Sequence, residues 1–263
     1  VSPDGQYAAY CEARWQQSTD DRKTELWVVA TGADPQPRRL TFDRANSRLP
    51  QWSADGRTIY FLAERKREAE KKPPLDGKTQ VWRIGLDGGE PQPVTQVEGG
   101  IKGYGLAASA DQLYYSVDAS TTDEDAFSKL RKQFSALEYQ QGKRTVSEVW
   151  RLDLKTWRAE KVTAEKRYVR EFAVTADGKR VAMISAADDS VLKSEGESRV
   201  DVWEDGGVTT PPTDVYRAKA PSPHAWLESL AWSPDGQRFA FCAVFAAYPA
   251  EIVVGSKASG QRQ

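Results

Sequence analysis

The chain has 263 residues, a length that fits one large domain or two small ones. Hydrophobic residues make up 39% and charged residues 29%, which is the balance of an ordinary folded domain. The net charge is −1, which gives no electrostatic reason to expect a nucleic acid or an anionic membrane as partner. No apolar run approaches the ~20 residues that cross a bilayer.

A turn motif recurs along the chain. Its copies are Ser2-Pro3-Asp4-Gly5, Ser53-Ala54-Asp55-Gly56, Ser109-Ala110-Asp111-Gln112, Thr175-Ala176-Asp177-Gly178 and Ser233-Pro234-Asp235-Gly236. Successive Asp residues are 51, 56, 66 and 58 positions apart. Asp accepts hydrogen bonds from nearby backbone amides, and Gly takes the left-handed dihedrals that close a tight turn. The third copy lacks the Gly, so we expect a shortened turn there.

Two further phrases repeat in step with the turn. The first contains a Trp and reads ELWVV (25–29), QVWRI (80–84), EVWRL (148–152) and VDVWE (200–204), with a worn copy, EIVV, at 251–254. The second follows a connection rich in Gly and Pro and reads RRLTF (38–42), QPVTQ (92–96) and EKVTA (160–164). Each unit therefore predicts four short antiparallel strands, with the Asp turn between the first two.

Repetition of such a unit every ~50 residues is typical of the blades of a β-propeller. A β-sandwich would not repeat the same phrases in the same order, and a parallel α/β fold would need helices between its strands. The predicted fold class is therefore all-β, a propeller of four-stranded antiparallel blades. A single blade cannot cover both of its faces, so we expect neighbouring blades to stack.

About five blades or partial blades are predicted within one propeller fragment, 1–263. Their approximate bounds are 1–45, 46–99, 100–166, 167–222 and 223–263. The first copy of the repeat lacks its first strand, and the fifth copy stops after its third strand. Because residue 1 already lies inside a motif, we expect the chain to be a fragment of a longer protein.

Two insertions interrupt the repeats. The segment 64–78 is dense in charge and Pro, and we expect a solvated hairpin tip with charges too mixed for a phosphate site. Segment 120–144 places Phe127, Leu130, Phe134 and Leu137 on one face of a predicted helix, with Thr122 and Asp125 as a capping box and Gly142 as its stop. That helix either lies back on its own blade or docks another domain or subunit.

No catalytic motif is apparent, so we assign no catalytic, cofactor-binding or metal-binding residue and leave the substrate-binding residues unknown. His224, the one histidine, lies in a Pro-rich linker and is expected at the surface. Segment 196–200 (GESRV) lacks the second Gly of a nucleophile elbow and precedes a strand rather than a helix. The acidic pairs Asp20-Asp21 and Asp188-Asp189 are expected in solvated loops.

Two cysteines, Cys11 and Cys242, occupy equivalent strand positions, seven residues after the Asp of their turns. A disulfide between them would require the first and fifth copies to be neighbours in space. We expect two small buried hydrophobic side chains instead. Neither a Cys/His cluster nor a CxxC pair suggests zinc, and no cofactor is expected.

The phrase W-S-P/A-D-G, the strand L/V-W-x-V/I/L and the closing R-L-T resemble the propeller of prolyl oligopeptidase family serine peptidases, above all acylaminoacyl-peptidase and dipeptidyl-peptidase-like bacterial members. The resemblance covers essentially the whole chain. It implies an α/β-hydrolase domain, absent here, that carries the catalytic Ser, Asp and His. Glu204-Asp205, beside a Gly-Gly turn, is too weak a match to the glutamate pair that anchors a substrate amino terminus, and none of these roles is carried over.

The resemblance implies a non-catalytic propeller that gates peptide access to the hydrolase domain and docks on it. Peptide substrates, that domain and a homo-oligomer are then the expected partners, with no nucleic acid and no membrane. The compartment stays open; the cytoplasm is favoured over the periplasm or secretion. The same phrases occur in the periplasmic propeller of the Tol-Pal system. The alternative is therefore a protein-binding or peptide-binding scaffold without enzymatic activity.

Overall fold

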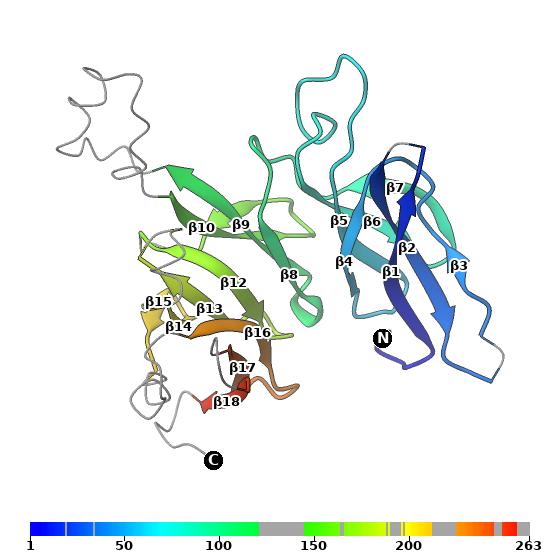
Figure 1. Cartoon of the computed structure of the whole chain (residues 1–263). Helices are drawn as coiled ribbons and strands as arrows, with labels where there is room; N and C mark the ends of the chain where they lie inside the picture. The colour runs from blue at the N-terminus through cyan, green and yellow to red at the C-terminus, as the bar shows by residue number, and fades with distance from the viewer. Residues whose placement is uncertain are drawn as a thin grey trace, which may run out of the picture. The chain divides into compact units, whose positions relative to one another are not determined.

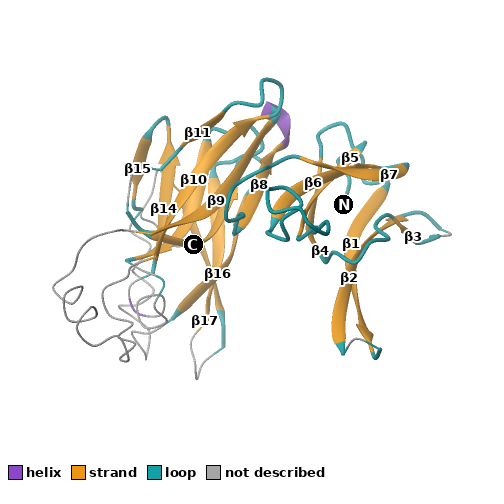
Figure 2. Cartoon of the chain, turned by 90° about the horizontal axis from the view of Figure 1, so that it is seen from above, coloured by secondary structure: helices purple, strands orange, loops and turns teal. Residues whose placement is uncertain are grey.

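The computed structural model describes residues 1–18, 20–33, 35–120, 145–163, 166–187, 189, 196, 198–211, 225–244 and 249–256. Almost all of its regular elements are β-strands, arranged in five antiparallel sheets (Figures 1 and 2). The predicted all-β propeller class is confirmed. The chain divides into two compact units, Val1–Tyr115 and Ser116–Gln263.

The first two sheets lie in the first unit. The three-stranded sheet consists of β1 (Tyr7–Gln16), β2 (Asp21–Ala30) and β3 (Arg38–Arg39). The four-stranded sheet consists of β4 (Ser47–Trp52), β5 (Thr58–Ala63), β6 (Gln80–Gly85) and β7 (Gly88–Pro93), in that order. As predicted, the first copy of the repeat lacks its first strand.

The third sheet has the order β8-β9-β10-β11, and its second strand spans the boundary between the units. Its strands are β8 (Gly103–Ala107), β9 (Gln112–Ser120), β10 (Thr145–Asp153) and β11 (Ala159–Lys161). A single turn of 3-10 helix, Ala108–Ala110, replaces the Asp-Gly turn between β8 and β9. Asp111 takes the left-handed conformation there, with φ 51°, in the role that Gly fills in the other copies.

Sheets four and five belong to the second unit. One contains β12 (Tyr168–Val174), β13 (Arg180–Ala186), β14 (Arg199–Glu204) and β15 (Gly207–Thr209). The other contains β16 (Trp226–Trp232), β17 (Arg238–Val244) and β18 (Glu251–Ser256). Within the described residues this fifth sheet has three strands.

The Asp turns form a repeated hydrogen-bond unit. In the second copy the Ser53 hydroxyl donates to Asp55 Oδ1 at 2.5 Å and accepts from the Thr58 amide at 3.0 Å. Asp55 Oδ1 also accepts from the Arg57 amide at 3.0 Å. The same arrangement recurs at Ser2 and Asp4, at Thr175 and Asp177, and at Ser233 and Asp235. These contacts close the first hairpin of a blade from local residues alone.

The apolar strands pack between neighbouring sheets. In the first unit a buried cluster joins Leu26 of β2 to Ile59 and Phe61 of β5. In the second unit another cluster joins Ile184 of β13 to Phe241 of β17. Within each of these two pairs, one sheet covers a face that its neighbour would otherwise expose to water, which is the stacking that the sequence predicts.

Candidate functional site

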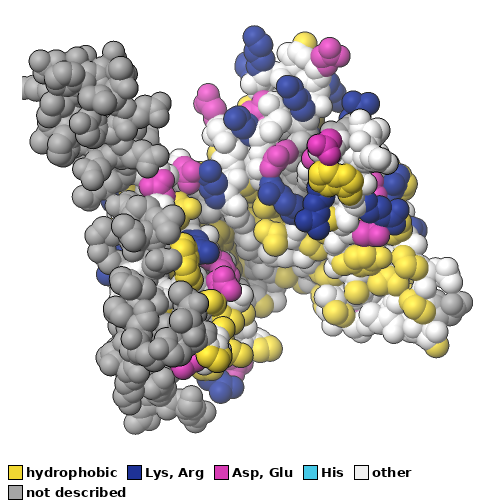
Figure 3. Space-filling model, viewed as in Figure 1, with side chains coloured by type: hydrophobic (Ala, Val, Ile, Leu, Met, Phe, Trp, Pro, Cys, Tyr) yellow, Lys and Arg dark blue, Asp and Glu magenta, His cyan; other side chains and the backbone are white. Residues whose placement is uncertain are grey.

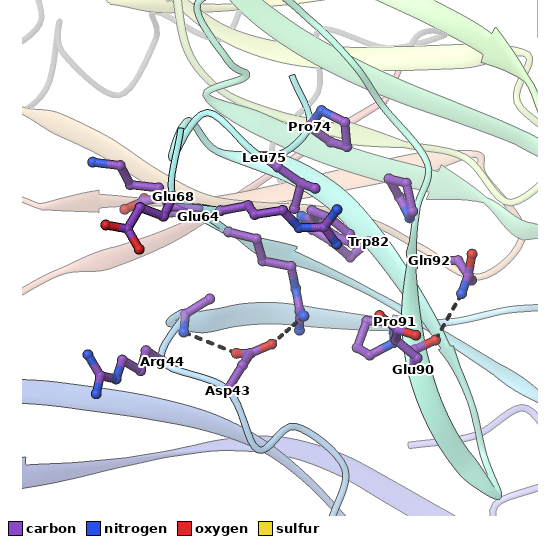
Figure 4. Close-up of a pocket in the computed structure, with 15 residues that line it drawn as sticks. Asp43, Arg44, Glu64, Glu68, Pro74, Leu75, Trp82, Glu90, Pro91 and Gln92 are labelled. Carbon is purple, nitrogen blue, oxygen red and sulfur yellow. Dashed lines mark hydrogen bonds and ion pairs between the residues drawn. The ribbon is translucent and has the colours of Figure 1, made fainter. Parts of the chain in front are cut away.

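The first unit contains a pocket of about 800 Å³, which we call the β5–β6 pocket. Its walls come from the link before β4 (43–45), the connection after β5 (64–68 and 74–75) and strand β7 (90–93), with Trp82 of β6 between them (Figure 4). This volume lies in the ordinary range of small-molecule and peptide sites.

The connection from β5 to β6 folds back on itself to make one wall. Lys66 and Asp76 form an isolated β-bridge, and the Arg67 amide donates to the Leu75 carbonyl at 3.0 Å. Residues 66–72 are exposed, as predicted for a solvated hairpin tip. Residues 73–77 are half-buried, and Leu75 packs on the hydrophobic cluster. One limb of the segment is thus a solvated tip and the other a packed wall, because Leu75, its one large aliphatic residue, packs on the core.

Arg65 connects three parts of the wall. Its guanidinium pairs through Nη1 with Asp43 and lies 4.8 Å from the ring centre of Trp82. Only 13% of the side chain is exposed. Burial lowers the pKa of Arg65, and the nearby Asp43 and Glu90 carboxylates oppose that shift. The stacking and the ion pair hold a largely desolvated cation beside the pocket.

Charges of both signs surround this buried arginine. Arg44, Lys66, Arg67, Glu68 and Glu90 are exposed, and their side chains form no hydrogen bond or ion pair with another described residue. Figure 3 shows basic and acidic side chains interspersed over the region of this connection. The rim can therefore offer charged contacts to a ligand without first breaking pairs of its own.

A second charged cluster lies in the second unit and is centred on Asp201. This residue is 2% exposed and accepts from the Ser185 hydroxyl at 2.5 Å and the Thr210 hydroxyl at 2.6 Å. Arg199 Nε lies 2.8 Å from Asp201 Oδ1, and Arg167 Nε lies 3.7 Å from Oδ2. Both carboxylate oxygens have partners, and the adjoining cavity is only about 10 Å³. The cluster therefore stabilises the fold and is not a ligand site.

The residues weighed as catalytic candidates do not assemble into a site. Ser198, from the segment tested as a nucleophile elbow, is buried directly before β14, and a strand follows it instead of a helix. Asp20, Asp21 and Asp189 are exposed. Glu204 pairs with Arg180 at 2.8 Å. Asp188, His224 and residues 121–144, which include the predicted helix, lie outside the described residues.

The two cysteines are free and half-buried, so no disulfide joins them. Burial raises the pKa of the Cys11 thiol to about 11. Among the described residues no group of three or more His, Cys, Asp or Glu could hold a metal ion. Over the same part of the chain no helix has the length and apolar character needed to cross a membrane.

Comparison with curated proteins identifies two peptidases. The chain is 24% identical over 144 residues to the uncharacterized peptidase YuxL of Bacillus subtilis, which is 50% of this chain and 20% of that protein. It is 27% identical over 125 residues to dipeptidyl-peptidase 5 of Porphyromonas endodontalis, 47% of this chain and 16% of that protein. The matched segments are thus at most a fifth of these relatives. No protein-family model matches the chain.

Solved structures show the same fold. An oligogalacturonate lyase in complex with manganese aligns over 100% of this chain and 62% of its own, at 15% identity with a TM-score of 0.65. A putative TolB from Agrobacterium tumefaciens aligns over 100% and 77%, at 15% identity with a TM-score of 0.61. The β-propeller domain of the Trilobed protease from Pyrococcus furiosus aligns over 98% and 79%, at 12% identity with a TM-score of 0.51.

Together these comparisons confirm the resemblance predicted from the sequence. The chain has the β-propeller fold, which the putative TolB and the Trilobed protease propeller share, and about half of it is similar in sequence to two peptidases.

Proposed function

We propose that this chain is the non-catalytic propeller portion of a serine peptidase of the prolyl oligopeptidase family. It gates the approach of peptides to an α/β-hydrolase domain on which it docks, so that short peptides enter and folded proteins do not. The five sheets would then be successive blades of one propeller. The observation that carries the proposal is the sequence similarity to two peptidases, at 24% and 27% identity, within a propeller fold.

The absence of a catalytic constellation among the described residues agrees with a role that leaves the chemistry to another domain. The side chains that were candidates are exposed aspartates, a buried serine before a strand and a paired glutamate. Acyl transfer needs a nucleophile, a base and an orienting group within hydrogen-bond reach of one another. These side chains do not form such a set.

The test compares this chain with the complete protein that its gene encodes. We expect the complete protein to hydrolyse acyl-peptide or dipeptide chromogenic substrates and to lose that activity when its predicted nucleophile Ser is changed to Ala. The 263-residue chain alone should show no turnover. A complete open reading frame without a G-x-S-x-G elbow, or turnover by this chain alone, would contradict the proposal.

The second candidate function is a protein-binding scaffold like the Tol-Pal propeller. Its support is the alignment with the putative TolB, which covers all of this chain and 77% of that one. Under this alternative the complete protein has a secretory signal, lacks a hydrolase domain and turns over no peptide. Affinity capture from a periplasmic extract with the complete protein would then recover one stoichiometric partner.

A further inference from the structure

We propose that the β5–β6 pocket binds a carboxylate carried next to an apolar group, and that the Arg65 guanidinium is its main contact. The proposal is independent of the function proposed above. It rests on the hydrogen bonding of Arg65, on the unpaired charges at the rim and on the apolar residues between them.

The first observation is that one side of the Arg65 guanidinium makes no hydrogen bond within the described residues. Arg65 Nη1 pairs with Asp43, whereas Nε and Nη2 are buried and have no hydrogen-bond partner among the described residues. These two atoms carry the parallel N–H groups that receive a carboxylate in a two-point interaction. Buried donors without an acceptor are costly and uncommon, so an acceptor that a ligand brings to this edge would remove that cost.

Burial strengthens the same contact once it forms. Because Arg65 is only 13% exposed, a carboxylate paired with it is little screened by water. Both donor atoms are covered by neighbouring atoms, so a ligand reaches them only after a side chain beside Arg65 rotates away.

The charges at the rim favour a single negative charge. Among the described residues, Arg44, Lys66 and Arg67 are cations and Glu68 and Glu90 are anions whose side chains form no hydrogen bond or ion pair. Glu64, the remaining charged residue of the lining, pairs with Arg48, and Asp43 pairs with Arg65, so the charges left at the rim sum to one positive charge. A carboxylate matches this balance, whereas two glutamates would repel the second charge of a phosphate.

Apolar residues lie between the charged ends of the pocket. Figure 4 shows Pro74, Leu75 and Trp82 in the middle, with Arg44 and Glu68 on one side and Pro91 on the other. A ligand whose carboxylate reaches Arg65 would lay a neighbouring aliphatic group against Leu75. Such a group occurs at the free C-terminus of a peptide that ends in an apolar residue, and in a free branched aliphatic acid.

Calorimetric titration of the 263-residue chain at low salt tests the proposal with three probes. They are N-acetyl-Ala-Pro-Leu with a free carboxylate, the same peptide as its C-terminal amide, and 4-methylpentanoate. We expect the acid peptide to bind at least tenfold more tightly than the amide. Binding of 4-methylpentanoate as tight as that of the peptide would identify a free acid as the ligand; weaker binding would identify a peptide C-terminus. Equal affinity for acid and amide peptides, or no binding of either acid, overturns the proposal.

Three variants test whether the carboxylate binds at Arg65 in this pocket. Arg65→Lys keeps the positive charge but loses the two-point edge, and should weaken binding of the acid at least tenfold. Arg44→Gln with Arg67→Gln should weaken it several-fold and reduce its salt dependence. Arg57→Gln changes an exposed arginine in the Asp turn between β4 and β5 of the same sheet, and this variant should bind as the unmodified chain does.

Circular dichroism first establishes that each variant is folded. If Arg65→Lys does not fold, the double variant decides, because Arg44 and Arg67 are exposed and form no pair whose loss would unfold the chain. Unchanged affinity in the double variant, or in a folded Arg65→Lys chain, overturns the proposal.

Discussion

Gly255 of β18 stands directly opposite Phe239 of β17, and the phenyl ring fills the space that a side chain at position 255 would need. A Cβ atom at Gly255 would lie 2.5 Å from Phe239 Cζ. The ring has little freedom to retreat, since Phe239 is 1% exposed and contacts Trp232 edge-to-face at 5.6 Å.

The change Gly255→Ala should therefore lower the free energy of unfolding by about 1–3 kcal/mol, because the added methyl group overpacks a filled core. Urea denaturation followed by Trp fluorescence measures the loss. Gly32→Ala is the control, since a Cβ there meets no atom within 4 Å. Equal free energies of unfolding for Gly255→Ala and Gly32→Ala would contradict the close approach of Phe239 to position 255.

The Asp turns should make stability depend on pH in the acid range. In each of four copies a Ser or Thr hydroxyl, followed by a backbone amide, lowers the pKa of the turn carboxylate: Asp4, Asp55, Asp177 and Asp235. A lowered folded-state pKa adds stability that is present above the unfolded pKa of ~3.9 and is lost as pH falls through the folded value. Urea midpoints should therefore fall below about pH 4.

The double variant Asp55→Asn with Asp177→Asn isolates this effect. It should be less stable than the unmodified chain at pH 7, because the charged acceptors are gone. The difference should shrink as pH falls through 4, where the unmodified carboxylates also become neutral. A difference that stays constant from pH 7 to pH 2.5 would show that the carboxylate charges play no part.

The buried carboxylate of Asp201 should contribute far more to the free energy of unfolding than an exposed carboxylate does. Asp201→Ala removes the carboxylate that pairs with Arg199 and Arg167 and accepts from Ser185 and Thr210, and we expect a loss of about 3–5 kcal/mol in the free energy of unfolding. Asp189→Ala, at an exposed position, serves as control.

Cys11 should be a poorly reactive thiol in the folded chain. With its pKa raised to about 11 by burial, only about a thousandth of it is thiolate at pH 8. In a Cys242→Ser background, Ellman's reagent should modify the remaining thiol slowly in buffer and rapidly in guanidinium chloride. Equal rates in the two solvents would mean that the thiol is not shielded.

The four repeated Trp residues occupy equivalent positions in their sheets but have different surroundings. Trp27, Trp82, Trp150 and Trp203 each pair with the outermost strand of their own sheet, opposite Arg39, Pro93, Lys161 and Val208. Their surroundings differ, however. Trp82 is 3% exposed and donates to the Ala63 carbonyl, whereas Trp150 is half-buried and donates to Glu148. The repeat predicts a strand position, and neighbouring segments decide what covers it.

By itself the sequence determined the hairpins and their order, because each Asp turn is closed by residues at most five positions apart and each strand by its own apolar pattern. It also predicted stacked sheets, because no blade can cover its own faces. Only the tertiary structure decided which charge of the 64–72 run is buried. Arg65 meets Asp43 from 22 positions earlier and Trp82 from 17 positions later, once three segments have packed together. Local propensity carries no information about such contacts, since burial of an arginine depends on partners that the chain brings together only on folding.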